Sequence, residues 1–284
     1  MRAIGHHTVS AIGFGAMELS VDGRPDRAAA IETVHASLDA GVRLIDTADA
    51  YCLGASDKGH NEELVAEALR AWSGPQDEVL IATKGGHDRT ADGGWPVDGR
   101  PEYLRAACEA SLRRLGAEAI GLYQYHRPDP TVPYADSVGA IKQLQDEGKI
   151  VMAGISNANV QQIRQAVDIL GPGRLAAVQN EFSPRFLSSM GELELCGELG
   201  IAFLPWSPLG GMGDASSLGE RFPAFLAVAD ARGISAQQVA LAWELGLGTH
   251  VIPIPGCRRR FTAESSAAAA DIELTADEMA RLSA

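Results

Sequence analysis

The sequence predicts a single α/β domain, a closed (β/α)8 TIM barrel that covers residues 1–284. Short runs rich in Val, Ile, Leu and Ala alternate with longer amphipathic stretches from residue 12 to about 270, which is the pattern of repeated strand-helix units. Eight such runs are present, and eight strands can close a barrel that has no exposed sheet edge. A chain of 284 residues also lies within the range of one such barrel.

The predicted strands are short apolar runs separated by turn residues. The residues before Ile12 are expected to form a small β cap. No tract rich in Ser, Gly and Pro divides the chain, so one domain is the expectation. The eight strands are expected at residues 12–16, 42–45, 79–83, 120–125, 150–155, 176–179, 201–204 and 250–254.

Proline or aspartate at the start and glycine after the end predict helices between these strands. Two longer loops, 85–99 and 209–217, follow strands three and seven. In a barrel both loops rise at the C-terminal rim, where barrel enzymes build their sites, so they are expected to act as lids or substrate walls. The clearest helices are expected at residues 24–40, 101–115, 134–147 and 235–245.

Composition excludes several classes of function. The net charge of −13 argues against nucleic acid, which requires a basic surface. No apolar run approaches the ~20 residues that span a bilayer, and the N-terminus lacks a secretion signal, so we expect a cytoplasmic protein that binds no membrane. The four cysteines, at 52, 108, 196 and 257, form no CxxC pair, and no metal-binding spacing is present. We therefore expect reduced thiols and no metal.

Four titratable side chains stand at or near the ends of three consecutive predicted strands. Asp46, Lys84 and His126 end strands two, three and four, and Tyr51 follows in the loop after strand two. Alone, the aspartate is typical of a helix cap, the lysine of a solvated surface and the histidine of a structural hydrogen bond. Because strand ends converge on one rim, their joint arrival favours a catalytic site.

The motifs around these residues resemble the aldo-keto reductases. LIDTADAY at 44–51, ATK at 82–84 and YHRPD at 125–129 carry the resemblance. It extends over nearly the whole chain, through GFGAM at 13–17, GKIVMAGISN at 148–157, QNEFS at 179–183, WSPLG at 206–210 and VIPIPG at 251–256.

The resemblance implies NADP(H)-dependent reduction of a small aldehyde or ketone. Tyr51 would donate a hydrogen bond and then a proton to the carbonyl oxygen as charge grows there. The Lys84 ammonium is expected to tune Tyr51 by favouring phenolate, because a free tyrosine, of pKa ~10, is a reluctant acid. Asp46 would hold Lys84, and His126 would orient the carbonyl oxygen.

The resemblance also implies a cofactor site. Ser156, Asn157 and Gln179 would bind the nicotinamide carboxamide, and Trp206 would stack on its ring. The loop after strand seven would hold the pyrophosphate, and the arginine run after strand eight would meet the 2′-phosphate, which favours NADP(H) over NAD(H). The remaining expected cofactor residues are Ser207, Leu209 and Gly211 in that loop, Arg258, Arg259 and Arg260 in the run, and Gly15, Met17, Gly256 and Ser266 around them.

The sequence departs from the family pattern at two places. Ser265-Ser266 stands where relatives often carry a Glu-Asn pair on the adenine, and Cys52 stands where many have Gly. A cofactor-binding regulatory or redox-sensing subunit with little turnover remains an alternative, as does a barrel enzyme in which Lys84 forms a Schiff base. Substrate, reaction direction and oligomeric state stay open. An apolar pocket could include Met17, Trp95, Trp206 and Met212.

Overall fold

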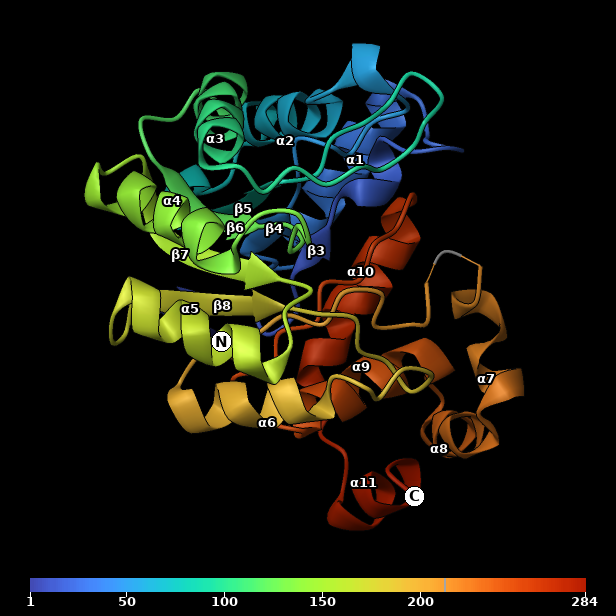
Figure 1. Cartoon of the computed structure of the whole chain (residues 1–284). Helices are drawn as coiled ribbons and strands as arrows, with labels where there is room; N and C mark the ends of the chain where they lie inside the picture. The colour runs from blue at the N-terminus through green and yellow to red at the C-terminus, as the bar shows by residue number, and fades with distance from the viewer. Residues whose placement is uncertain (212) are drawn as a thin grey trace.

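The computed structural model describes residues 1–211 and 213–284. Its centre is a curved sheet of seven parallel strands in which each strand pairs with the next along the chain (Figure 1). This order is that of a TIM barrel and confirms the predicted fold class. The strands are β3 (Phe14–Gly15), β4 (Leu44–Asp46), β5 (Leu80–Gly85), β6 (Ile120–Tyr125), β7 (Ile150–Ser156), β8 (Leu175–Gln179) and β9 (Ala202–Phe203).

The segment expected as the eighth strand, 250–254, forms only isolated bridges, although it joins the two ends of the sheet. Ile252 N–H donates to the carbonyl of Phe203 at 2.8 Å, and Gly13 N–H donates to the carbonyl of Pro253 at 2.9 Å. Proline has no N–H, so this segment can only accept hydrogen bonds at its proline positions. The prolines therefore interrupt a regular ladder while the segment still connects the last strand with the first.

A two-stranded hairpin made of β1 (Arg2–Ile4) and β2 (His7–Val9) forms the expected cap. Ile4 and Val9 are buried in the same cluster as the inward-facing residues of the sheet, including Leu44 and Leu122. The guanidinium of Arg2 donates to backbone carbonyls in the 245–251 region. The hairpin thus supplies apolar side chains that fill the base of the barrel.

Helices cover the outside of the curved sheet (Figure 1). Buried faces of these helices pack on the outward side chains of the strands in two large clusters, which form the outer core. The α-helices are α1 (Arg27–Asp39), α2 (His60–Ala71), α3 (Pro101–Leu115), α4 (Tyr134–Asp146), α5 (Val160–Leu170), α6 (Met190–Leu199), α7 (Leu218–Arg221), α8 (Pro223–Arg232), α9 (Ala236–Gly246), α10 (Arg260–Ala268) and α11 (Ala276–Leu282). Short 3-10 turns add η1 (Met17–Leu19), η2 (Ala55–Asp57), η3 (Gln76–Glu78), η4 (Ala215–Ser217) and η5 (Ala269–Asp271).

The helix ends follow the local signals of the sequence. The Asp26 carboxylate accepts a hydrogen bond from Ala29 N–H at 2.9 Å and caps α1. Gly116 ends α3 at φ 67°, a left-handed conformation that glycine adopts without steric cost. Predicted and observed bounds of the four clearest helices agree within three residues, because caps and stops are local properties. Among the described helices, none has the length and apolar character needed to cross a bilayer.

Candidate active site

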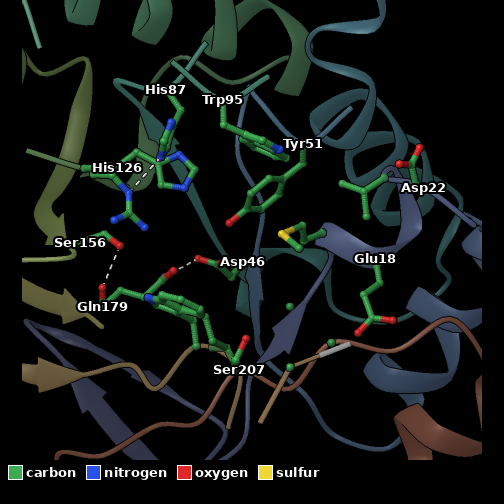
Figure 2. Close-up of a pocket in the computed structure, with 18 of the residues that line it drawn as sticks. Glu18, Asp22, Asp46, Tyr51, His87, Trp95, His126, Ser156, Gln179 and Ser207 are labelled. Atoms are coloured by element: carbon green, nitrogen blue, oxygen red, sulfur yellow. Dashed lines mark hydrogen bonds between the residues drawn. The ribbon is translucent and has the colours of Figure 1, made fainter. Parts of the chain in front are cut away.

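The four expected catalytic side chains meet at one end of the sheet. Figure 2 shows three of them, Asp46, Tyr51 and His126. Asp46 is the last residue of β4, Lys84 lies near the end of β5, and His126 directly follows β6. All three point inward because parallel strands deliver their carboxyl ends to one rim. Tyr51 reaches the same place from the loop after β4. Asp46, Tyr51 and His126 line a cavity of about 750 Å³, and Lys84 is fully buried behind them.

The ammonium of Lys84 connects the carboxylate with the phenol. Lys84 Nζ donates to Asp46 Oδ1 at 2.5 Å and to the Tyr51 hydroxyl at 2.9 Å. Its third hydrogen bond goes to the carbonyl of Thr47 at 2.9 Å. An ammonium has three donors, so every donor of Lys84 is used and its position is fixed.

The charge state of Lys84 follows from these contacts. Burial alone lowers the pKa of Lys84, but Asp46 and Tyr51 outweigh burial and raise that pKa above its ordinary value. The side chain is therefore an ammonium at neutral pH. A Schiff base requires a neutral amine as the nucleophile, so this environment disfavours that alternative.

The net pKa of Tyr51 differs from the sequence expectation. Burial raises the pKa of Tyr51, Lys84 lowers it and Asp46 raises it, with a net rise above the ordinary value of 10. As expected, the Lys84 ammonium lowers the pKa of Tyr51. The expectation is wrong for the net pKa, because burial raises it by more. Burial of the phenol, which the sequence does not reveal, decides the direction. Tyr51 is consequently protonated at neutral pH.

Two glutamine amides hold the second oxygen of the Asp46 carboxylate. Gln179 Nε2 donates to Asp46 Oδ2 at 2.7 Å, and Gln124 Nε2 donates to the same oxygen at 3.3 Å. These bonds satisfy the buried carboxylate and fix its orientation. Sequence reasoning missed Gln124, although its position two residues before His126 places both on the inward side of one strand.

His126 is a buried neutral imidazole. Burial lowers its pKa well below the ordinary value, and the positive charge of Lys84 lowers it further. Its ring lies edge-on to Tyr51, with centroids 5.7 Å apart. His126 Nδ1 has no hydrogen-bond partner among the described residues. In a neutral imidazole one ring nitrogen carries the proton and the other is an acceptor, so His126 can donate one hydrogen bond.

A second histidine and a tryptophan extend the cavity beyond His126. The ring of His87 lies 4.5 Å from that of His126, nearly perpendicular to it, and 5.9 Å from that of Trp95. His87 and Trp95 come from the 85–99 loop, which was expected to form a wall of the site. Trp95 also lies edge-on to Tyr51, with centroids 6.3 Å apart. Figure 2 shows these rings around one side of the cavity.

The ends of β7 and β8 carry the polar residues expected to bind a nicotinamide. Ser156 Oγ donates to the carbonyl of Gln179 at 2.7 Å, and Asn157 Nδ2 donates to the carbonyl of His126 at 2.9 Å. Asn157 has φ 57°, a left-handed conformation that asparagine tolerates better than most residues. All three expected residues line the cavity, so the strand ends form one polar wall.

The loop after β9 forms the opposite wall. Trp206, Ser207, Leu209 and Gly211 line the cavity as expected, and Met212 lies outside the described residues. The indole Nε1 of Trp206 is buried and has no hydrogen-bond partner among the described residues.

Comparison with known proteins assigns the chain to a family. The model of the aldo/keto reductase family matches residues 11–284. The chain belongs to the aldo/keto reductase family. An uncharacterized oxidoreductase of Schizosaccharomyces pombe is 35% identical over 98% of this chain and 87% of its own length. A 6-dehydroglucose reductase of Novosphingobium aromaticivorans is 35% identical over 91% of this chain and 86% of its own length.

Solved structures of aldo-keto reductases have the same fold. The glycerol dehydrogenase of Gluconobacter oxydans is 26% identical and superposes with a TM-score of 0.84 over 100% of this chain and 93% of its own. An aldo-keto reductase of Klebsiella pneumoniae in complex with NADPH is 26% identical, with a TM-score of 0.79 over 99% of this chain and 94% of its own. The chain thus spans nearly the full length of both enzymes.

The residues of this aldo-keto reductase that were expected to bind the adenosine part of the cofactor lie farther apart than the catalytic residues. Gly15, Met17 and Gly256 line the cavity, whereas the arginine run and Ser266 are not among its lining residues. Arg258 turns toward the loop after β3, where it pairs with Glu18. Arg259 is exposed at the start of α10, and Ser266 is buried within this helix. Arg260 forms ion pairs with Glu264 and Glu32.

Close contact between backbones explains the glycines at this end. A Cβ atom at Gly15 would lie 2.7 Å from the carbonyl oxygen of Ile254, which is too close for any side chain. Gly15 and Gly256 also form a parallel bridge. Both glycines therefore allow β3 and the 250–256 segment to approach each other beside the cavity.

Proposed function

We propose that this aldo-keto reductase uses NADPH to reduce an aldehyde or ketone to an alcohol, with Tyr51 as the general acid. The observation that carries the proposal is the position of the Lys84 ammonium between the Asp46 carboxylate and the Tyr51 hydroxyl at the floor of the cavity. A buried phenol held by a buried cation is a costly arrangement for a merely structural role.

The residues of the site match the charge that develops during carbonyl reduction. NADPH, when bound, would supply the hydride. As negative charge grows on the carbonyl oxygen, the Tyr51 hydroxyl and the ring N–H of His126 would both donate hydrogen bonds to it. The Tyr51 proton would then pass to this oxygen, and the Lys84 ammonium would stabilise the phenolate that remains. Asp46 keeps Lys84 in place throughout.

The polar walls of the cavity fit a nicotinamide nucleotide. Asn157 and Gln179 offer amide groups. Arg258 is paired with Glu18, which lines the cavity, and is the residue that would bind the 2′-phosphate. Further support comes from the Klebsiella pneumoniae enzyme, a relative that binds NADPH.

Substitution of Tyr51 by phenylalanine tests the role of the hydroxyl. Tyr51→Phe removes one donor to the developing oxyanion, so kcat should fall at least ~10²–10³-fold. The aromatic ring stays, so NADPH binding, measured by fluorescence titration, should be retained. NADPH oxidation at 340 nm across a panel of aldehydes and ketones is the activity measurement. A variant with near-normal turnover would refute the assignment, and a wild-type protein that binds NADPH but turns over no carbonyl would favour a regulatory role.

A further inference from the structure

We infer that the preferred substrates carry a carboxylate close to the carbonyl group, and that Arg127 recognises it. This inference rests on the proposed function, because it concerns the substrate that would lie between Tyr51 and His126. It depends on two arginines, Arg127 and Arg89, which both line the cavity on the side of the aromatic rings. Neither is in an ion pair with another described residue.

Arg127 is the residue next to His126 and is held by neutral groups only. Its Nε donates to His87 Nε2 at 3.3 Å, and its Nη2 donates to Asn157 Oδ1 at 3.2 Å. His87 Nε2 is thus an acceptor, so the ring carries its proton on Nδ1 and bonds the carbonyl of Pro96 at 3.2 Å. These contacts orient the guanidinium without forming an ion pair. Glu181 lies close enough to interact with its charge, because burial raises the pKa of Glu181 whereas Arg185 and Arg127 lower it.

Arg89 adds a second positive charge beside the ring of Trp95. Its side chain is only 8% exposed, and its guanidinium lies 3.9 Å from the ring centroid of Trp95. Its Nη2 donates to the carbonyls of Cys52 and Leu53 at 2.9 Å each. The described hydrogen bonds of its guanidinium all go to backbone carbonyl oxygens, so dipoles rather than a carboxylate stabilise this buried cation.

Most carboxylates that line the cavity lie away from the two arginines. Asp46 is compensated by Lys84, and Glu18 and Asp22 lie on the far side of Tyr51 from His126 and His87 (Figure 2). Asp92 also lines the cavity, in the same loop as Arg89, but it is exposed and accepts a hydrogen bond from Thr90. In a chain with a net charge of −13, the two arginines therefore place positive charge on the side of the cavity that the aromatic rings form.

The chemistry of the guanidinium selects the substrate class. Arginine binds carboxylates through two parallel N–H donors, which gives both orientation and charge recognition. Arg127 and His126 both line the cavity, and Arg127 is bonded to His87, whose ring centroid lies 4.5 Å from that of His126. A substrate whose carbonyl oxygen is bonded to His126 therefore lies close to Arg127. Oxo acids and aldehydo acids with a few atoms between the two groups have this geometry, whereas neutral sugars and simple aromatic aldehydes lack the negative charge.

A matched pair of substrates tests the inference in the full-length protein with NADPH. The pairs are 4-formylbenzoate with 4-formylbenzamide and 4-oxobutanoate with 4-oxobutanamide, which differ in charge but hardly in size. Wild-type protein should show a higher kcat/KM for the acid of each pair. Arg127→Gln should remove this preference by lowering kcat/KM for the acid about ten-fold, a value reduced from that of a buried pair because Arg127 is exposed. Arg127→Lys should restore part of it.

Controls separate substrate recognition from other effects. Arg113→Gln removes the same charge from an exposed position on α3 outside the cavity and should leave the acid-to-amide ratio unchanged. The acid-to-amide ratio is the decisive quantity in Arg127→Gln, because an effect on NADPH binding through Asn157 would change kcat/KM for both members of a pair equally. An equal loss for acid and amide would assign Arg127 a purely structural role and overturn the inference, as would wild-type preference for the amide or for a neutral sugar. Failure of the proposed function would look different, since the wild type would then reduce neither member of a pair.

Discussion

Arg258 Nε lies 3.4 Å from a carboxylate oxygen of Glu18, and Arg258 Nη2 donates to the carbonyl of Asp22 at 2.8 Å. The guanidinium expected to bind the 2′-phosphate is thus already paired with an acid at the edge of the cavity. A phosphate that binds Arg258 must compete with Glu18. Affinity for NADPH should therefore depend on both residues.

Substitution of Glu18 by glutamine should tighten NADPH binding. The variant removes the competing charge, and it also removes a carboxylate that would repel a phosphate beside it. Burial raises the pKa of Glu18 and Arg258 lowers it, so the pair is only partly screened by solvent. We expect the Kd for NADPH to fall about three- to ten-fold, in line with the value of a partly exposed charge pair. Fluorescence titration with NADPH and NADH measures this, and an equal gain for both cofactors would contradict it.

Substitution of Arg258 by alanine should have the opposite effect. Loss of one charged hydrogen bond to phosphate corresponds to a weakening of NADPH binding by roughly ten- to a hundred-fold, with NADH binding preserved. Arg260→Ala is the matched control, because Arg260 pairs with Glu264 and Glu32 on the outer surface. A loss in Arg260→Ala as large as that in Arg258→Ala would assign the effect to the general charge of the run instead.

The pH dependence of carbonyl reduction should lack a step near the ordinary pKa of histidine. The pKa of His126 lies well below 6.5, so its neutral form predominates at every pH above that value. Tyr51 has a pKa raised above 10 and stays protonated until strongly alkaline pH. We expect kcat/KM for reduction to be flat from pH 6.5 to about 9 and to fall above about 10 as Tyr51 loses its proton. A decline centred near pH 6.5 would contradict the neutral assignment of His126.

A buried carboxyl group in α9 predicts a stabilising substitution. Glu244 in α9 is 0% exposed, and neither of its carboxyl oxygens has a hydrogen-bond partner among the described residues. Burial raises its pKa well above 4.5. The pKa of Glu244 is higher in the folded than in the unfolded protein. Its contribution to the free energy of unfolding is therefore fully present below pH 4.5 and is lost as the pH rises toward the folded-state pKa.

Glu244→Leu should consequently raise the free energy of unfolding by about 1–3 kcal/mol at pH 8, and by less at pH 5. Urea unfolding followed by circular dichroism at both pH values measures the difference. Glu244→Gln is the control, because it removes the titratable group and keeps a polar group, and its gain should be smaller. A Glu244→Leu variant less stable than the wild type at pH 8 would mean that the carboxyl group has a compensating role.

Those parts of the fold and site that depend on local order along the chain were predictable. Asp46, Lys84 and His126 could be found because each ends a recognisable apolar run, and barrel geometry then brings the ends together. The pairing of Arg258 with Glu18 could not, because these residues are far apart in sequence and neither has a distinguishing neighbour. The net pKa of Tyr51 also escaped prediction, since burial has no sequence signature.

The prolines of the closing segment have a consequence for biosynthesis. Gly13 and Gly15 donate to the carbonyls of Pro253 and Pro255, so the first strand of the sheet gains its second neighbour only when residue 255 has left the ribosome. Until then both edges of the half-formed sheet present unpaired backbone groups, which invite association between nascent chains. A translation product that stops before residue 250 would keep these edges exposed, and we therefore expect it to aggregate or to be degraded by protein quality control.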